Sequence, residues 1–160
     1  MMEKSKVKIL FVCLGNICRS PAAEAIFRQK AISEGVLERL EIDSAGLNGY
    51  HDGEPADQRM IRHASQRGYR ITSVSRKIIP SHDFVYFDMI VGMDNFNFKE
   101  LKRLASPCGA QEKVFKMTDF AINCSAKEVP DPYYGGAAGF ENVLDILEDC
   151  SEGLLNNIEL

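Results

Sequence analysis

Residues 7–21 read VKILFVCLGNICRSP, and this stretch decides the fold. Its first part, Val7–Val12, is short, mostly apolar and rich in β-branched residues, which predicts a parallel strand buried on both faces. Ser20 is a favourable N-cap residue, and Pro21 suits the first position of a helix, where a missing N–H has no cost. We therefore expect a strand, a very short connection and a helix that continues to about Glu34.

The connection, residues 13–19, has the composition of an anion-binding loop. Gly15 and Asn16 tolerate unusual backbone angles, so the loop can turn successive N–H groups inward, beside the positive end of the helix dipole. Arg19 adds a planar guanidinium that can hold two phosphate oxygens at once. Cys13 lies where this positive field is strongest, so we expect its thiolate to be stabilised. The segment predicts a phosphate cradle with a sulfur nucleophile.

Strand and helix patterns continue to alternate along the chain. Further strands are predicted at Leu40–Ser44, Asp88–Met93 and Lys113–Met117, and helices at Pro55–Arg67, Asn95–Ala105 and Gly139–Asn156. Alternation of this kind is typical of a mainly parallel sheet with helices on both faces. We predict an α/β fold of one domain, residues 1–160: a doubly wound sheet of four parallel strands flanked by helices, with the phosphate-binding loop after the first strand.

Two motifs carry a family resemblance. Val12–Pro21 resembles the signature of the low-molecular-weight protein tyrosine phosphatases, and VPDPYYG at residues 129–135 resembles the general-acid loop of that family. Weaker similarity covers Asp43–Gly46 and the Met93–Asp94 pair. The resemblance extends over nearly the whole chain, and both specific motifs occur in the order that the family has.

The resemblance implies hydrolysis of phosphotyrosine in proteins, with inorganic phosphate as product, and activity on small aryl phosphates as well. Cys13 would attack phosphorus and form a phosphocysteine, while Arg19 and the loop amides hold the phosphate oxygens. Asp131, held between two prolines, would protonate the leaving oxygen and then activate water. The resemblance implies no metal and no other cofactor.

The family also implies which residues bind the substrate. Tyr50, Tyr133 and Tyr134 match its aromatic pocket walls, and Asn16 matches the asparagine that holds the loop in shape. Relatives that act on phosphoarginine carry threonine at the position of Ile17, so isoleucine favours a flat aromatic ring. The full set of predicted substrate-binding residues is Leu14, Gly15, Asn16, Ile17, Cys18, Ser20, Tyr50, Tyr133 and Tyr134.

Two positions leave a question open. Ser20 can cap the helix, or its hydroxyl can donate a hydrogen bond to the Cys13 thiolate, and the resemblance favours both roles. Several relatives brace the loop with a histidine near the position of Val74, whose side chain can neither donate nor accept. The brace is therefore missing here or comes from elsewhere.

The chain contains five cysteines and three histidines. Cys18 shares the loop with Cys13, and the family uses the matching pair as a reversible, protective disulfide; the alternative is a small residue packed behind the loop. The remaining cysteines, Cys108, Cys124 and Cys150, are interpreted as ordinary reduced thiols. The histidines lack metal-ligand spacing and are interpreted as surface or loop residues.

The charge and the apolar pattern of the chain argue against two classes of binding partner, nucleic acids and membranes. The net charge is −4 and there is no run of lysine or arginine, so a nucleic-acid partner is not expected. The N-terminal residues lack the apolar core of a signal peptide, and no stretch is long and apolar enough for a membrane span. We predict a cytoplasmic protein, a monomer or weak homodimer, with no membrane partner.

Two other functions remain open. A thiol-dependent arsenate reductase has the same fold and loop, but it needs further cysteines on a segment around residue 80, and residues 80–94 contain none. A non-catalytic phosphate-binding or phosphocysteine-carrier module would need the loop without a general acid, so Asp131 argues against it.

Overall fold

The computed structural model describes residues 5–133 and 135–160. Its sheet has four parallel strands in the order β2-β1-β3-β4: β1 (Val7–Cys13), β2 (Leu40–Gly46), β3 (Met89–Gly92) and β4 (Val114–Lys116). The helices are α1 (Arg19–Ser33), α2 (Gln58–Gln66), α3 (Pro80–Tyr86), α4 (Asn95–Ala105) and α5 (Gly136–Asn157), with 3-10 turns at η1 (Leu37–Arg39), η2 (Ser106–Cys108), η3 (Gln111–Lys113) and η4 (Met117–Phe120). None of the helices in the described ranges combines the length and the apolar character that crossing a bilayer requires.

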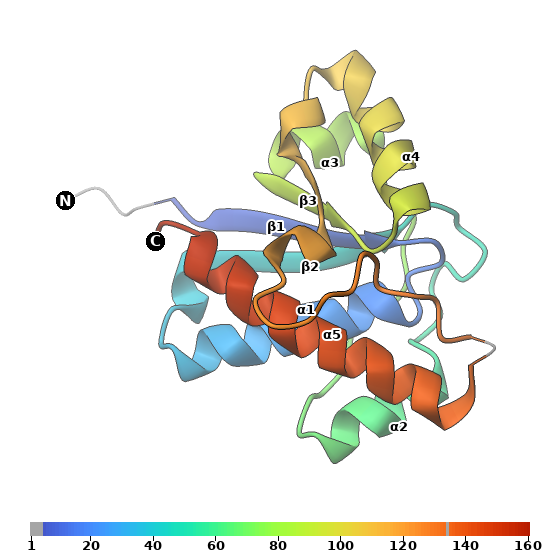
Figure 1. Cartoon of the computed structure of the whole chain (residues 1–160). Helices are drawn as coiled ribbons and strands as arrows, with labels where there is room; N and C mark the ends of the chain where they lie inside the picture. Colours follow the sequence, from blue (N-terminus) through green and yellow to red (C-terminus); the bar gives the residue numbers. More distant parts are fainter. Residues whose placement is uncertain (1–4, 134) are drawn as a thin grey trace.

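Strand β1 is the centre of the fold and is buried on both faces, as predicted. Ile9 and Phe11 pack into the core on one face of the sheet, and Leu10 and Val12 pack into the core on the other. All four side chains are fully buried. Figure 1 shows α1, α2 and α5 on one side of the sheet and α3 and α4 on the other. The predicted doubly wound architecture with four parallel strands is therefore confirmed.

The order of the strands creates a crevice at the carboxyl end of β1. From β1 the chain goes to β2 on one side, and later it crosses to β3 on the other side of β1. Connections that leave in opposite directions open a gap beyond the strand ends, and ligands of open α/β sheets bind there. The loop after β1 is therefore at the usual place for a ligand.

The start of α1 differs from the prediction. The helix begins at Arg19 with Cys18 in the N-cap position, and no side chain caps it. Ser20 is therefore not the N-cap, and Pro21 is the third helical residue rather than the first. Pro21 is still tolerated because backbone N–H groups in the first turn have no intrahelical acceptor.

Other boundaries shift by a few residues. The helix predicted at Pro55–Arg67 begins only at Gln58, because the side chain of Asp57 caps it there. The closing helix begins earlier than predicted, at Gly136. The sequence pattern does not predict α3, because its seven residues are too few for a clear helical period.

Candidate active site

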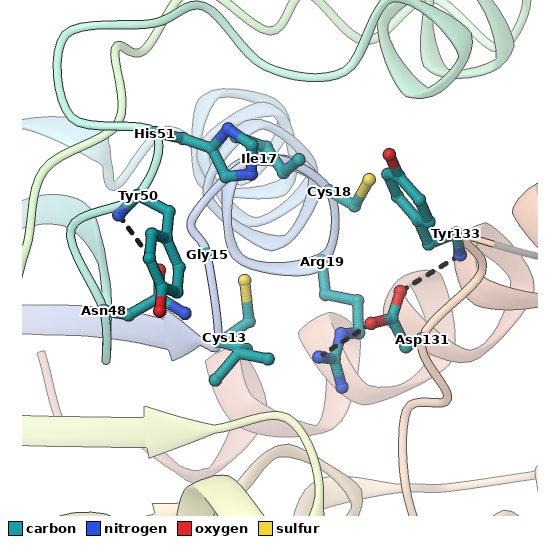
Figure 2. Close-up of a pocket in the computed structure, with 11 residues that line it drawn as sticks. Cys13, Gly15, Ile17, Cys18, Arg19, Asn48, Tyr50, His51, Asp131 and Tyr133 are labelled. Atoms are coloured by element: carbon teal, nitrogen blue, oxygen red, sulfur yellow. Dashed lines mark hydrogen bonds and ion pairs between the residues drawn. The ribbon is translucent and has the colours of Figure 1, made fainter.

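The carboxyl end of β1 opens into a cavity of about 240 Å³. Cys13, the last residue of β1, lies at its base, and the loop that leads into α1 curves around its sulfur (Figure 2). The lining comes from three separate parts of the chain, namely Cys13, Leu14, Gly15, Ile17, Cys18 and Arg19, then Asn48, Tyr50 and His51, and finally Asp131 and Tyr133. Most of the predicted site residues therefore surround one cavity.

The loop has the features of an anion cradle. Within the described part of the chain, no protein group accepts a hydrogen bond from the backbone N–H groups of residues 14–18. These groups lie at the N-terminus of α1, where the helix dipole is positive. An anion in the cavity can therefore accept several hydrogen bonds without displacing an existing protein contact.

Asn16 holds the loop in its shape. It is the one non-glycine residue with positive φ among the described residues, at 58°. Its side-chain Nδ2 donates to the hydroxyls of Ser20 (2.8 Å) and Ser44 (3.0 Å), and its Oδ1 accepts from the backbone N–H of Arg76 (3.1 Å). The Ser75 hydroxyl donates to the Asn16 carbonyl at 2.5 Å. These hydrogen bonds offset the strain of a left-handed residue, about 1–3 kcal/mol.

The same hydrogen bonds show what braces the loop here, where several relatives have a histidine near the position of Val74. Its side chain is 56% exposed, and it does not brace the loop. The brace comes from the next two residues, through the hydroxyl of Ser75 and the backbone of Arg76.

Ser20 faces the nucleophile. Its Oγ lies 3.1 Å from the Cys13 sulfur, and both residues are buried. Asn16 donates to the Ser20 oxygen, so the hydroxyl proton can point to the sulfur at 3.1 Å or to the more distant Ala45 carbonyl at 3.4 Å. Of the two roles considered for this serine, the geometry favours the hydrogen bond to the thiolate.

Arg19 is buried and held in position by the segments around it. Its Nη1 donates to the Asp94 carboxylate (2.6 Å) and to the Val129 carbonyl (3.1 Å), and its Nη2 lies 3.8 Å from the Asp131 carboxylate. Burial works against its charge, but Cys13 and Asp94 outweigh burial and raise the pKa of the guanidinium. Arg19 is therefore a fixed positive charge at the cavity wall.

Asp131 and Tyr133 form the wall beside Arg19. Asp131 is about half exposed, and its Oδ1 accepts the backbone N–H of Tyr133 at 3.0 Å. The guanidinium of Arg59 lies 5.1 Å from the centre of the Tyr133 ring, donates to the Tyr133 carbonyl and pairs with Asp57. Tyr134, also predicted to bind substrate, lies outside the described residues.

The opposite wall comes from the segment after β2. Figure 2 shows Tyr50 across the cavity from Tyr133, and the Tyr50 side chain is 86% exposed. His51 also lines the cavity, with its Nδ1 2.7 Å from a Glu54 carboxylate oxygen. A Cβ on Gly15 would lie 3.2 Å from the His51 ring, so the glycine leaves room for it.

Cys18 lies in the cavity lining near the nucleophile. It is 5% exposed, and burial, followed by the charge of Asp57, raises the pKa of its thiol. Its thiolate is therefore disfavoured, which leaves Cys13 as the better nucleophile of the two. The predicted disulfide between them stays a prediction.

Sequence reasoning missed the roles of Asp94, Asn48, His51 and Arg59. Asp94 follows β3, the neighbour of β1, and polar residues at the carboxyl ends of adjacent strands meet at one edge of the sheet. The position of Asp94 directly after a strand could therefore have identified it as a site residue from the sequence. The interpretation of the histidines was wrong for His63, which lies in α2, stacks on a phenylalanine and is mostly buried.

The chain is similar in sequence to a known family of proteins. Residues 8–160 match the family described as low molecular weight phosphotyrosine protein phosphatase. A protein of that description from Schizosaccharomyces pombe is 39% identical over 153 residues, which cover 95% of this chain and 97% of the relative.

The chain is also similar in sequence and fold to solved structures of phosphatases. A protein tyrosine phosphatase from Entamoeba histolytica, with Hepes in the active site, is 48% identical, with a TM-score of 0.91 over 94% of this chain and 96% of that chain. The Drosophila arginine phosphatase is 31% identical, with a TM-score of 0.87 over 94% and 96% of the two chains. Together with the sequence match, these similarities show that the chain belongs to the low molecular weight phosphotyrosine protein phosphatase family.

Proposed function

We propose that this protein hydrolyses phosphotyrosine in proteins through a phosphocysteine intermediate. The observation that carries the proposal is that the Cys13 thiol, the Arg19 guanidinium and the Asp131 carboxyl group line one cavity. A nucleophile, a fixed positive charge and an acid are the groups that metal-free transfer of a phosphoryl group requires. Family membership supports phosphatase activity in general.

In the first step the Cys13 thiolate attacks phosphorus in line with the departing phenolic oxygen. The S–P bond forms as the P–O bond breaks, and the proton of the Asp131 carboxyl group goes to the phenolic oxygen. Arg19 and the N–H groups of residues 14–18 hold the equatorial phosphate oxygens, where negative charge is spread in the transition state. The Ser20 hydroxyl stabilises the thiolate before attack.

In the second step the phosphocysteine is hydrolysed. The Asp131 carboxylate, now deprotonated, takes a proton from water, and the resulting hydroxide attacks phosphorus. The S–P bond breaks and returns its electron pair to the Cys13 thiolate. Inorganic phosphate leaves, and both groups are restored for another turnover.

The cavity walls support an aromatic substrate. Tyr50 and Tyr133 stand on opposite sides, and their large amphipathic rings suit a phosphotyrosine ring between them. The Drosophila arginine phosphatase has the same fold, so the choice between phosphotyrosine and phosphoarginine depends on side chains. Ile17 lines the cavity with an apolar surface, which favours the aromatic ring.

The leaving group provides the sharpest test of the two-step mechanism. We expect phosphate release from a phosphotyrosine peptide without added metal, and none from Cys13→Ser. Asp131→Asn should lower kcat/KM about 10²–10⁴-fold for phenyl phosphate, but much less for p-nitrophenyl phosphate, whose leaving group needs little protonation. The exposed Cys108 provides the matched control, and Cys108→Ser should keep wild-type activity.

Other outcomes would favour the remaining functions. An equal loss for both aryl phosphates in Asp131→Asn would contradict the general-acid role and would leave Asp131 as a positioning partner of Arg19. Thiol-dependent reduction of arsenate without phosphatase turnover would favour the reductase. Phosphate binding with no turnover in either assay would favour the carrier module.

A further inference from the structure

A second pair of thiols lies away from the active site. Cys124 follows η4, and Cys150 lies on α5. The two sulfur atoms and a carboxylate oxygen of Asp149 are all within 4.8 Å of one another, although the cysteines are far apart in sequence. Both are free thiols. We propose that Cys124 and Cys150 form a reversible disulfide when the protein meets a hydroperoxide, as a redox site separate from Cys13 and Cys18.

The backbone holds the two thiols together. The Asp149 carboxylate accepts backbone N–H groups of Ile122 (2.9 Å), Asn123 (3.0 Å) and Cys124 (3.1 Å), so it fixes this segment to α5. Figure 1 shows the segment after β4 running across α5. These hydrogen bonds therefore hold the backbone of Cys124 beside the turn of α5 that carries Cys150.

Gly153 lets the two segments approach closely on the next turn of α5. A Cβ at this position would lie 1.8 Å from the backbone oxygen of Phe120. Helix α5 and η4 are therefore in backbone contact just before the chain reaches Cys124. This contact fixes the two backbones beside each other three residues after Cys150 and four residues before Cys124.

The two thiols differ in exposure to solvent, and this difference determines which thiol reacts with the oxidant first. Cys124 is partly exposed, whereas Cys150 is fully buried, and burial raises the pKa of Cys150 to about 12. We therefore expect the oxidant to react with Cys124 first.

The reaction is balanced with one hydroperoxide molecule. The Cys124 thiolate attacks the peroxide; an S–O bond forms, the O–O bond breaks, and the leaving oxygen takes a proton to become water or an alcohol. The Cys150 sulfur then attacks the Cys124 sulfenic acid, and the S–S bond forms as the S–O bond breaks. The departing hydroxide leaves as water with the Cys150 proton. The two thiols lose two electrons, and the peroxide gains them.

A metal ion fits this group of residues less well than a disulfide. Two thiolates and a carboxylate are ligand types for zinc, which is usually held by four. The Asp149 carboxylate already accepts three backbone N–H groups and the side-chain amide of Asn123. The Cys124 thiol is hydrogen-bonded to this carboxylate and to Cys150, which holds its sulfur beside the second thiol.

Peptide mapping tests the proposal. The triple variant Cys13→Ser/Cys18→Ser/Cys108→Ser keeps this pair as its last two cysteines. After treatment with hydrogen peroxide, alkylation under denaturing conditions and digestion without reductant, we expect a peptide that links Cys124 to Cys150. The intact mass should fall by two hydrogen atoms, and dithiothreitol should reverse the change. The wild-type protein should give the same linked peptide.

Thermal unfolding provides a second measurement. A cross-link that closes a loop of this length constrains the unfolded chain, so the linked protein should have a Tm roughly 5–10 °C above the same protein after reduction. Adding Cys124→Ser to the triple variant gives the matched control, which should form no link and show no shift in Tm. Cys150 stays in place, so the core is unchanged.

Two results would overturn the proposal. One is full alkylation of both cysteines after peroxide treatment. The other is oxidation of Cys124 to sulfinic acid while Cys150 remains a free thiol. A linked protein with an unchanged or lower Tm would contradict the stabilising effect.

Discussion

Replacing Asp94 by asparagine tests how Arg19 is held, because Asp94 has two roles that this change separates. One carboxylate oxygen accepts a 2.6 Å hydrogen bond from Arg19, and the other accepts the backbone N–H of Asn97 at 2.7 Å and so caps α4. Asparagine caps a helix about as well as aspartate, so the cap should survive. The remaining amide group would face Arg19 with N–H donors, so the charged hydrogen bond should be lost.

The size of the effect follows from burial. The Arg19 side chain is 4% exposed, so water does not replace the lost partner, although the Val129 carbonyl still accepts from the same nitrogen. A hydrogen bond to a charged group contributes about 1.5–3 kcal/mol. If Arg19 must be in place in the transition state, Asp94→Asn should lower kcat/KM by about 10–150-fold.

The assay combines steady-state kinetics on a phosphotyrosine peptide with thermal unfolding. Asp94→Asn should lose activity while its Tm stays close to that of the wild type. Asp94→Ala also removes the cap, so its Tm should fall by a further ~2–4 °C. The reasoning is refuted if Asp94→Asn keeps kcat/KM within about twofold of the wild type while Asp94→Ala loses stability, because Asp94 would then act only as a helix cap.

Three further changes test the fold and the site. Gly153→Ala places a Cβ 1.8 Å from a backbone oxygen of η4 and should destabilise the protein by about 3 kcal/mol or more. Gly139→Ala in the same helix is the control, because its added Cβ would have no contact under 3.7 Å and should not destabilise the protein. Equal Tm values for the two variants would contradict the close contact between α5 and η4. Burial raises the pKa of Glu24 above its ordinary value of 4.5, so the stability that its proton provides is present below pH 4.5 and is lost as pH rises through the folded-state pKa. Glu24→Gln should therefore be more stable than wild type in chemical unfolding at pH 7–8, with a smaller difference at pH 4; a less stable variant at pH 7–8 would argue against a buried charge. Ser20→Ala removes the hydroxyl 3.1 Å from the Cys13 sulfur and should lower kcat/KM about 10–150-fold on aryl phosphates, and unchanged kinetics would remove Ser20 from the mechanism.

The pattern of residues along the chain was enough to predict the central strand and the loop after it. Ile9–Val12 is buried on both faces, as expected for a short apolar run with β-branched residues in a parallel sheet. Asn16 adopts positive φ, a backbone conformation that its side chain tolerates locally. A parallel sheet with helices on both faces follows from the alternation of strands and helices along the chain. These features depend on near neighbours, so the sequence alone determined them.

Tertiary structure decided the features that depend on distant residues. Ser20 is a good N-cap by local preference, but its hydroxyl contacts Cys13 because β1 ends directly behind the first turn of α1. Asp94 becomes the partner of Arg19 only because β3 pairs with β1. Cys124 meets its partner thiol only where the segment after η4 packs on α5. Each of these contacts joins residues whose separation in space is set by the packing of the sheet and helices, and no local pattern along the chain contains that distance.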